Sequence, residues 1–432
     1  ISHWTKDKQN NFYLFLMDGK GLKYFCVYDI IESGICPVLF FVWCIRRDRL
    51  KNLKLAAVCL SCLTMTGCSA LNFSVEGLIN APKLTSEQSE IHQALIESVG
   101  SNITLKYPKN GEYRSAYVIA NIDDEPTDEA MVFYEYTSNG SEEDGLRVNI
   151  LDKDEKGKGD SVKELAGAGT DIDQVIISPM GSNNQTDVFV GYQNLTNDEK
   201  TMEIYSYTDG DFKRVALDTY SVLEPLDINN DGYIELITIQ RSTNNDTGAV
   251  TAKASMLNMK NNEITRGENV DMCDNVTSYV SSKTGMLDSG RRAIFIDGLT
   301  ADGKLQTEII YYRYSGLQNP MQLRSEKLLP LCTRPAGYYS EDMDGDGDVE
   351  IPSTSPMVGY ENAVADEMLY MTTWSVYEDF YDLKTKYTGY YAISDGYFVT
   401  FPKRWNSSVT VKKDSDTNEL VFYKYTGDIN ES

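Results

Sequence analysis

Two nine-residue stretches, Asp227–Glu235 and Asp342–Glu350, constrain this chain more than any other feature. Each has an oxygen-bearing side chain at positions 1, 3, 5 and 9 and a glycine at position 6. Alternate residues of such a loop point inward, the glycine permits the tight turn, and the carbonyl at position 7 adds a further oxygen. Ca²⁺ takes about six to eight oxygens, whereas Mg²⁺ gives up its waters reluctantly. We therefore expect two Ca²⁺ sites rather than two solvated Asp/Asn/Gly turns.

The two loops differ from EF-hands, which have a glutamate at position 12 and a helix on each side. Here the last acid stands at position 9, and the first loop leads into the β-branched, apolar run Ile234–Ile239, which predicts a strand. A cation would then stiffen a turn between strands and take no part in chemistry. The expected ligands are Asp227, Asn229, Asp231, the carbonyl of Tyr233 and Glu235, and in the second loop Asp342, Asp344, Asp346, the carbonyl of Asp348 and Glu350.

Weaker copies of the loop recur along the chain. Asn121–Glu129 aligns without a gap but has a proline in place of the glycine, so a degenerate metal set would contain Asn121, Asp123, Glu125 and Glu129. Gly181–Asp187 and Asp302–Glu308 also end in an acid that precedes an apolar run. The closing acids are then Glu129, Asp187, Glu235, Glu308 and Glu350, at spacings of 58, 48, 73 and 42 residues. These spacings centre on the length of a four-stranded blade with its loops.

The loops resemble the calcium loops of FG-GAP repeats, also called VCBS-type repeats, over about residues 113–402. This resemblance implies an all-β fold, a β-propeller of FG-GAP/VCBS-type blades similar to the integrin α head and to bacterial surface proteins. The propeller would span 113–432 and be truncated at its C-terminus, where a predicted strand enters another turn. Asp-Gly turns at 209–210 and 395–396 predict hairpins, and Pro352 predicts that the strand after the second loop is short or at an edge.

A short N-terminal helix precedes the predicted blades. Thr85 and Gln88 have the spacing of a capping box, apolar residues follow at helical spacing, and Gly100 ends the pattern. We expect this helix and lead-in, residues 84–112, to pack on the first blade, with a partner-binding helix as the alternative.

The segment 51–68 resembles a bacterial lipoprotein signal peptide. A basic start at Lys51–Lys54 precedes the apolar run Leu55–Leu63, which is too short to span a bilayer, and small residues precede Cys68. The resemblance implies lipidation of Cys68, a tether over 69–83 and a protein anchored by lipid to the cell membrane on its extracytoplasmic side. A core helix with an incidental cysteine is the alternative. Because a signal peptide opens a protein and this chain begins with Ile1, residues 1–50 would be a non-native upstream extension; a real membrane-proximal extension is the alternative.

Composition favours an exported binding protein. Residues 1–68 contain 9 of the 40 basic and 5 of the 65 acidic side chains, so the remaining 31 basic and 60 acidic residues give a net charge of −29. This excess argues against nucleic acid and against anionic membrane surfaces as partners. Beyond Cys68 only Cys273 and Cys332 remain. They would be two buried thiols or, outside the cytoplasm, a disulfide.

Catalytic motifs are missing from the sequence. His92 is the one histidine after the signal segment, which excludes a histidine-based triad or zinc cluster in the predicted blades. We expect the aromatic residues between Trp374 and Trp405 to be alternating core positions of the last blade; a ligand surface, represented by Trp374, Tyr377, Tyr381 and Trp405, is the alternative.

We therefore expect a monomeric, non-enzymatic binding or adhesion module for protein or glycan. The alternatives are a carboxylate-based glycosidase or lyase and a purely structural envelope protein. An acidic pocket at the propeller axis would favour the enzyme, and a flat aromatic face would favour the binder.

Overall fold

The computed structural model describes residues 3–6, 12–18, 21–27, 84–123, 125–137, 145–153, 159–180, 185–194, 199–208, 211–244, 246–260, 263–364, 367–378, 382–405, 407–414 and 419–429. The chain forms two compact units, Ile1–Leu84 and Thr85–Ser432. In the first unit, β1 (His3–Lys6), β2 (Phe12–Asp18) and β3 (Gly21–Val27) form an antiparallel sheet. The predicted signal segment and Cys68 lie outside the described residues. None of the described helices is both long and apolar enough to cross a bilayer.

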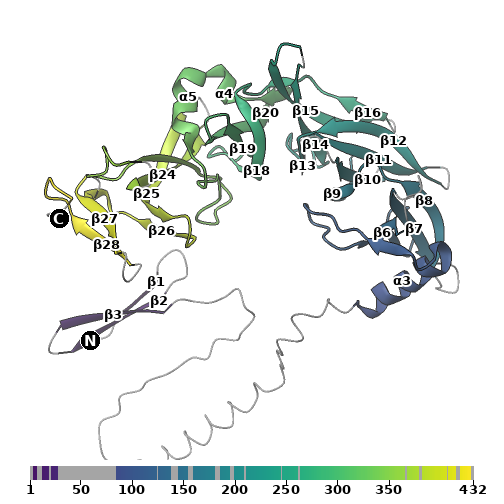
Figure 1. Ribbon diagram of the computed structural model, residues 1–432, viewed down its shortest axis with the longest axis horizontal. Coiled ribbons are helices and arrows are strands. Elements are labelled where there is room, and N and C mark those ends of the chain that lie inside the picture. Colours follow the sequence, from purple (N-terminus) through teal and green to yellow (C-terminus); the bar gives the residue numbers. More distant parts are fainter. Residues whose placement is uncertain are drawn as a thin grey trace, which may run out of the picture. The chain divides into compact units, whose positions relative to one another are not determined.

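The second unit is a series of antiparallel sheets, which we name S1 to S6 in chain order (Figure 1). Sheet S1 contains β4 (Ile103–Leu105), β5 (Tyr117–Ala120), β6 (Glu129–Tyr136), β7 (Leu146–Lys153) and β8 (Gly159–Ala166), and sheet S2 contains β9 (Asp171–Pro179), β10 (Thr186–Gln193), β11 (Lys200–Thr208) and β12 (Asp211–Tyr220). In S1 the order is β4-β6-β7-β8, with β5 also paired to β6, and in S2 it is β12-β11-β10-β9.

The next two sheets each carry one short additional strand. Sheet S3 contains β13 (Val222–Leu226), β14 (Glu235–Thr243), β15 (Val250–Lys260), β16 (Glu263–Arg266) and β17 (Val270–Asp271), and sheet S4 contains β18 (Val276–Met286), β19 (Arg292–Thr300), β20 (Lys304–Arg313), β21 (Gly316–Gln318) and β22 (Thr333–Pro335). Helices α4 (Pro320–Leu323) and α5 (Ser325–Cys332) connect β21 to β22.

The last sheets complete the described chain. Sheet S5 contains β23 (Ile351–Pro356), β24 (Tyr370–Glu378), β25 (Asp382–Ala392) and β26 (Tyr397–Thr400), and sheet S6 contains β27 (Val409–Lys413) and β28 (Leu420–Lys424), with the short 3₁₀ helix η3 (Lys403–Trp405) between them. The strand β23, which contains Pro352, is at the edge of S5, as the sequence predicts. Both predicted hairpins are present, β11–β12 and β25–β26.

The predicted helix is confirmed as α3 (Ser86–Val99). The side chain of its N-cap residue, Thr85, accepts from the backbone N–H of Gln88, and the Gln88 side chain accepts from the N–H of Thr85. Gly100 ends the helix with a φ of 87°, a value that favours glycine. Ile91 and Leu95 are buried against S1, so the helix packs on the first sheet.

Each sheet packs on the next one along the chain. Five shared cores join α3 with S1, S1 with S2, S2 with S3, S3 with S4, and S4 with S5, and a sixth joins S5 with S6. Because neighbours cover both faces, central strands such as β6, β10 and β14 contain continuous apolar runs instead of alternating ones. The prediction of an all-β chain built from antiparallel sheets is confirmed.

Candidate metal centres and a polar cavity

One hydrogen bond recurs in the turns of four sheets: a backbone N–H donates to a carboxylate seven residues later. The four pairs are Ile122–Glu129 (2.8 Å), Met180–Asp187 (3.4 Å), Ile228–Glu235 (3.1 Å) and Met343–Glu350 (2.7 Å). All four acids are closing acids of the predicted repeat, and each is at most 3% exposed. The repeat is therefore a structural unit in which a buried carboxylate holds the turn before a strand.

The predicted repeat at Asp302–Glu308 is wrong. Asp302 lies in the tight hairpin between β19 and β20, where its carboxylate accepts from the Thr300 hydroxyl at 2.6 Å. Glu308 lies in the middle of β20 and accepts from the distant backbone N–H of Cys273, at 2.9 Å. Sequence alignment placed it with the closing acids because an apolar run follows it, but a hairpin occupies the position of the loop.

In the first complete loop, the carboxylate of Asp227 accepts from the backbone N–H groups of Asp231 (3.0 Å) and Gly232 (3.3 Å). It also forms an ion pair with Arg292 at 2.9 Å. The side-chain amide of Asn229 donates to Asp231 at 3.1 Å and to Glu235 at 2.6 Å, so a neutral donor lies among the expected ligands. Burial, the main cause, raises the pKa of Glu235 to about 7.

The second complete loop holds an ammonium group. Lys386 Nζ lies 3.0 Å from Asp344, 2.6 Å from Asp346 and 2.7 Å from Glu350, the acids at positions 3, 5 and 9. Burial works to lower the pKa of Lys386, but its hydrogen bonds to these acids outweigh it and raise that pKa well above its usual range. Asp342 accepts from backbone N–H groups, including that of Gly347 at 2.9 Å.

The donor sets fit an oxygen-preferring cation to different degrees. The carboxylates of Asp342, Asp344 and Glu350 have oxygens within 4.8 Å of one another, and the first loop forms no such group among the described residues. Leu236 pairs with Leu257, so Asn258 lies opposite Glu235 on the neighbouring strand. The Oδ1 of Asn258 is buried and has no hydrogen-bond partner among the described residues. Asp342, Asp344, Asp346 and Glu350 would hold Ca²⁺ in the second loop, and Asp227, Asp231 and Glu235 in the first.

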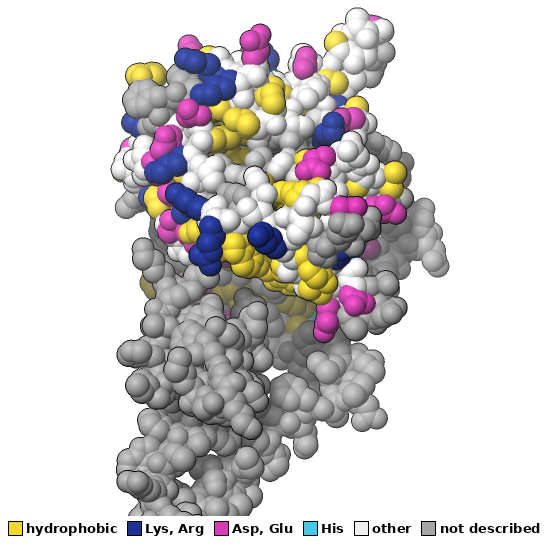
Figure 2. All heavy atoms as spheres, turned by 90° about the vertical axis from the view of Figure 1, so that its left-hand side faces the viewer, with side chains coloured by type: hydrophobic (Ala, Val, Ile, Leu, Met, Phe, Trp, Pro, Cys, Tyr) yellow, Lys and Arg dark blue, Asp and Glu magenta, His cyan; other side chains and the backbone are white. Residues whose placement is uncertain are grey.

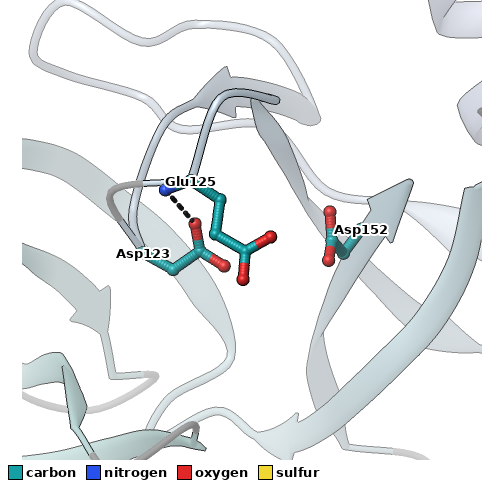
Figure 3. Close-up of side chains that lie close together, drawn as sticks. All are labelled: Asp123, Glu125 and Asp152. Carbon is teal, nitrogen blue, oxygen red and sulfur yellow. Dashed lines mark hydrogen bonds between the residues drawn. The ribbon is translucent and has the colours of Figure 1, made fainter. Parts of the chain in front are cut away.

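The degenerate loop gathers carboxylates as well. The backbone N–H of Glu125 donates to Asp123 at 3.0 Å, and the Asn121 amide donates to the Glu125 carbonyl. Figure 3 shows the carboxylates of Asp123 and Glu125 facing Asp152, a residue of β7 that sequence reasoning missed. No local pattern marks Asp152, since it reaches the loop only through strand pairing.

The candidate aromatic ligand surface is only partly on the surface. Trp374 is 1% exposed and Tyr377 is fully buried, so the expected core positions are confirmed for these two residues and the ligand-surface alternative is wrong for them. The Trp374 ring packs edge-on against Tyr391, with 5.7 Å between ring centroids. Trp405 is half-buried, and Tyr381 lies outside the described residues. On the face in Figure 2, charged side chains of both signs surround small hydrophobic areas.

A polar cavity of about 660 Å³ lies along the first strands of S2, S3 and S4. Its walls come from β9, β13 and β18, from Lys200 at the start of β11, and from the loop of residues 110–114. The side chain of Gln174 on β9 donates to the backbone carbonyl of Leu223 on β13 at 2.9 Å, which joins two walls.

The pKa values of two carboxylates in this cavity shift in opposite directions. Asp173 accepts from the Tyr220 hydroxyl at 2.7 Å and from Lys200 at 3.0 Å. Burial works to raise the pKa of Asp173, but these partners outweigh it and hold that pKa below its usual range. Burial raises the pKa of Glu224, against the hydrogen bond from Ser282 and the charge of Lys200. The cavity thus holds one ionised acid and one that retains its proton to higher pH.

The remaining polar candidates are structural. His92 Nδ1 lies 2.8 Å from the Tyr117 hydroxyl, which fixes α3 to S1. Cys273 and Cys332 are both buried free thiols, and burial raises the pKa of both above the ordinary thiol range.

No family model and no curated protein matches this chain. Solved structures with some likeness include a rhamnogalacturonan lyase, YesW, at 9% identity and a TM-score of 0.31, covering 74% of each chain. A candidate 6-phosphogluconolactonase from Bacteroides fragilis NCTC 9343 has 12% identity and a TM-score of 0.29, covering 74% of this chain and 90% of its own. A candidate exo-beta-1,3-galactanase from Bifidobacterium bifidum s17 has 9% identity and a TM-score of 0.21, covering 70% and 96%. At such low scores, these likenesses carry no argument about function.

Proposed function

We propose that this chain is a lipid-anchored, extracytoplasmic β-propeller of FG-GAP/VCBS type whose turns bind Ca²⁺ and which acts as a surface binding module. The observation that supports it best is the repeated turn, in which four buried acids accept the same backbone hydrogen bond. A buried carboxylate beside further acidic side chains favours a hard divalent cation, because an unpaired buried charge is costly. Ca²⁺ would stabilise the folded turns by mass action.

We place the ligand in the polar cavity of S2, S3 and S4, and we favour a glycan over a protein. The volume, about 660 Å³, lies within the usual range of small-molecule sites, about 300–1,000 Å³. Lys200, Glu224 and Asn110 offer donors and acceptors for hydroxyl groups. Trp374 and Tyr377 are buried in the core, so these two aromatic side chains cannot anchor a protein interface.

Calorimetry and a glycan array test this proposal on the purified protein. Ca²⁺ should bind the chelated protein with heat that Asp231→Ala and Asp346→Ala each reduce, and it should raise the melting temperature. A glycan should then be retained, and Lys200→Met should weaken its binding. Absence of Ca²⁺ heat at millimolar concentration would overturn the metal part. A glycan bound equally well by Lys200→Met would overturn the ligand site, and no ligand at all would favour the structural envelope protein.

The lipid anchor is tested separately by mass spectrometry of the native N-terminus. We expect cleavage between Gly67 and Cys68 and a diacylglyceryl group on the Cys68 thiol, because stable anchoring needs two lipid chains. A mature protein that begins upstream of residue 50 would contradict this and would restore residues 1–50 as native sequence.

A carbohydrate-active enzyme is the second candidate, and Asp173 and Glu224 favour it. Two acids whose pKa values move in opposite directions within one cavity are typical of an acid and base pair. New reducing ends or unsaturated products after incubation with polysaccharides, lost in Glu224→Gln, would support the enzyme. Glycan binding without turnover would support the binding module.

A further inference from the structure

The turn between β5 and β6 is only a partial copy of the loop in sequence, yet it assembles a cluster of three carboxylates beside a closing acid. Carboxylate oxygens of Asp123, Glu125 and Asp152 lie within 4.8 Å of one another (Figure 3). Asp123 and Glu125 come from the turn, whereas Asp152 comes from β7. Like charges this close repel one another unless a proton or a cation lies between them.

The strand register explains how Asp152 reaches the turn. Ala130 on β6 pairs with Leu151 on β7, so the next position places Glu129 opposite Asp152. Side chains of directly opposite residues share one face of a sheet. The same position opposite a closing acid holds Ser206 in S2, Asn258 in S3 and Val376 in S5. Of these four sheets, S1 alone has a carboxylate there.

Glu129 provides an independent sign of a ligand. It is 3% exposed, and its Oε2 accepts from the backbone N–H of Ile122. Its Oε1 is buried without a hydrogen-bond partner among the described residues. The strand register places Glu129 on the same face of S1 as Asp152. A buried carboxylate oxygen that lacks a partner costs free energy, and a coordinated cation would recover it.

The two complete loops each have a basic partner. There, Arg292 pairs with Asp227, and Lys386 pairs with three acids of the second loop. In the described part of the chain, Asp123, Glu125 and Glu129 form no ion pair with a lysine or arginine.

We propose that Asp123, Glu125, Glu129 and Asp152 form a third Ca²⁺ site, in which the carboxylate of β7 replaces the one that Asn121 cannot supply. All four ligands are carboxylates, which suits a hard cation, and affinity rises with the number of charged ligands. The bound ion ties the turn to β7 and so holds the β6–β7 end of the sheet. This inference shares with the proposed function only the binding of Ca²⁺ to turns, and it requires neither the lipid anchor nor the cavity.

Calorimetry with Ca²⁺ on the chelated full-length protein tests the site. Asp152→Asn keeps the shape and polarity of the side chain and reproduces the residue type that lies opposite Glu235. Because it removes the charge of one ligand, we expect one equivalent of Ca²⁺ to be lost or to bind at least about tenfold more weakly. Glu125→Gln, an exposed turn substitution with little effect on packing, should give the same loss. Glu263→Gln on β16, an exposed residue in another sheet, changes the charge equally and should leave every Ca²⁺ equivalent in place.

The outcomes separate this site from the two others. If Asp152→Asn and Glu125→Gln both bind as the parent does while Asp346→Ala loses an equivalent, the third site is wrong and the proposed Ca²⁺ loops stand. If Asp152→Asn and Glu125→Gln lose an equivalent that Asp231→Ala and Asp346→Ala retain, the third site stands by itself. A parent protein without any Ca²⁺ heat overturns both. Circular dichroism of each variant shows that a loss comes from the site and not from unfolding.

Discussion

The ammonium of Lys386 lies 2.7 Å from the carboxylate of Glu350. Lys386 belongs to β25 of S5, whereas Glu350 ends the turn that precedes β23. Glu350 is fully buried, whereas the Lys386 side chain is 21% exposed. The same ammonium contacts Asp344 and Asp346, so a side chain of β25 neutralises the second loop from outside it. A Ca²⁺ ion bound by these acids must compete with Lys386.

Lys386→Met should therefore raise the Ca²⁺ affinity of the second loop, by about tenfold or more. It should also lower the free energy of unfolding in EDTA, by about 1–3 kcal/mol, because three acids lose their cation. Urea denaturation with and without Ca²⁺ measures both effects. Lys384→Met removes an exposed ammonium of the same strand and is the control; equal behaviour of the two variants would contradict the prediction.

Arg334→Met should destabilise S4 strongly. Arg334 and Asp297 form an ion pair at 2.7 Å in which both side chains are at most 1% exposed. Removal of one partner leaves an uncompensated buried charge, which costs about 3–5 kcal/mol. Urea denaturation should show this loss, and Lys304→Met, which breaks the exposed pair with Asp302, should leave the midpoint unchanged. A small effect of Arg334→Met on the free energy of unfolding would contradict the prediction.

Glu224→Gln should make stability less dependent on pH. Burial raises the pKa of Glu224 above that of the unfolded chain, so the folded protein binds the additional proton. Stability is then full below the unfolded pKa, about 4.3, and falls as the pH rises through the folded value. At neutral pH, Glu224→Gln should be more stable than the parent, and at about pH 4 the two should agree. Unfolding curves at both pH values check this, and a constant difference between them would contradict it.

Gly389→Ala should disrupt the hairpin β25–β26. A Cβ at Gly389 would overlap the backbone carbonyl of Val399 and come within 2.9 Å of the Phe398 ring. A backbone carbonyl cannot move aside without the loss of strand pairing, so the free energy of unfolding should fall by about 1–3 kcal/mol or more. Gly316→Ala, where a Cβ would meet nothing within 4 Å, is the control. Equal melting temperatures of the two variants would show that β26 can shift at little cost.

The sequence by itself determined the elements whose signals are local. The capping box of Thr85 and Gln88 predicted α3, the Asp-Gly turns predicted two hairpins, and Pro352 predicted an edge strand. Loop periodicity also identified four closing acids, because a carboxylate seven residues from its N–H donor closes a short ring along one stretch of chain. These interactions depend on neighbours in sequence, so a pattern of residues is enough to predict them.

Tertiary structure decided which side chains meet in each turn. Asp152 reaches Glu129 through the β6–β7 register, and Lys386 reaches Glu350 across 36 residues of chain. The burial of Trp374 also depends on the strands that pack over it, so the aromatic residues around it in sequence could not decide between a core position and a ligand surface. Glu308 has the local pattern of a closing acid, but its donor is Cys273 from another segment. Pairing register and sheet stacking set these contacts, and neither is encoded in the residues around a single loop.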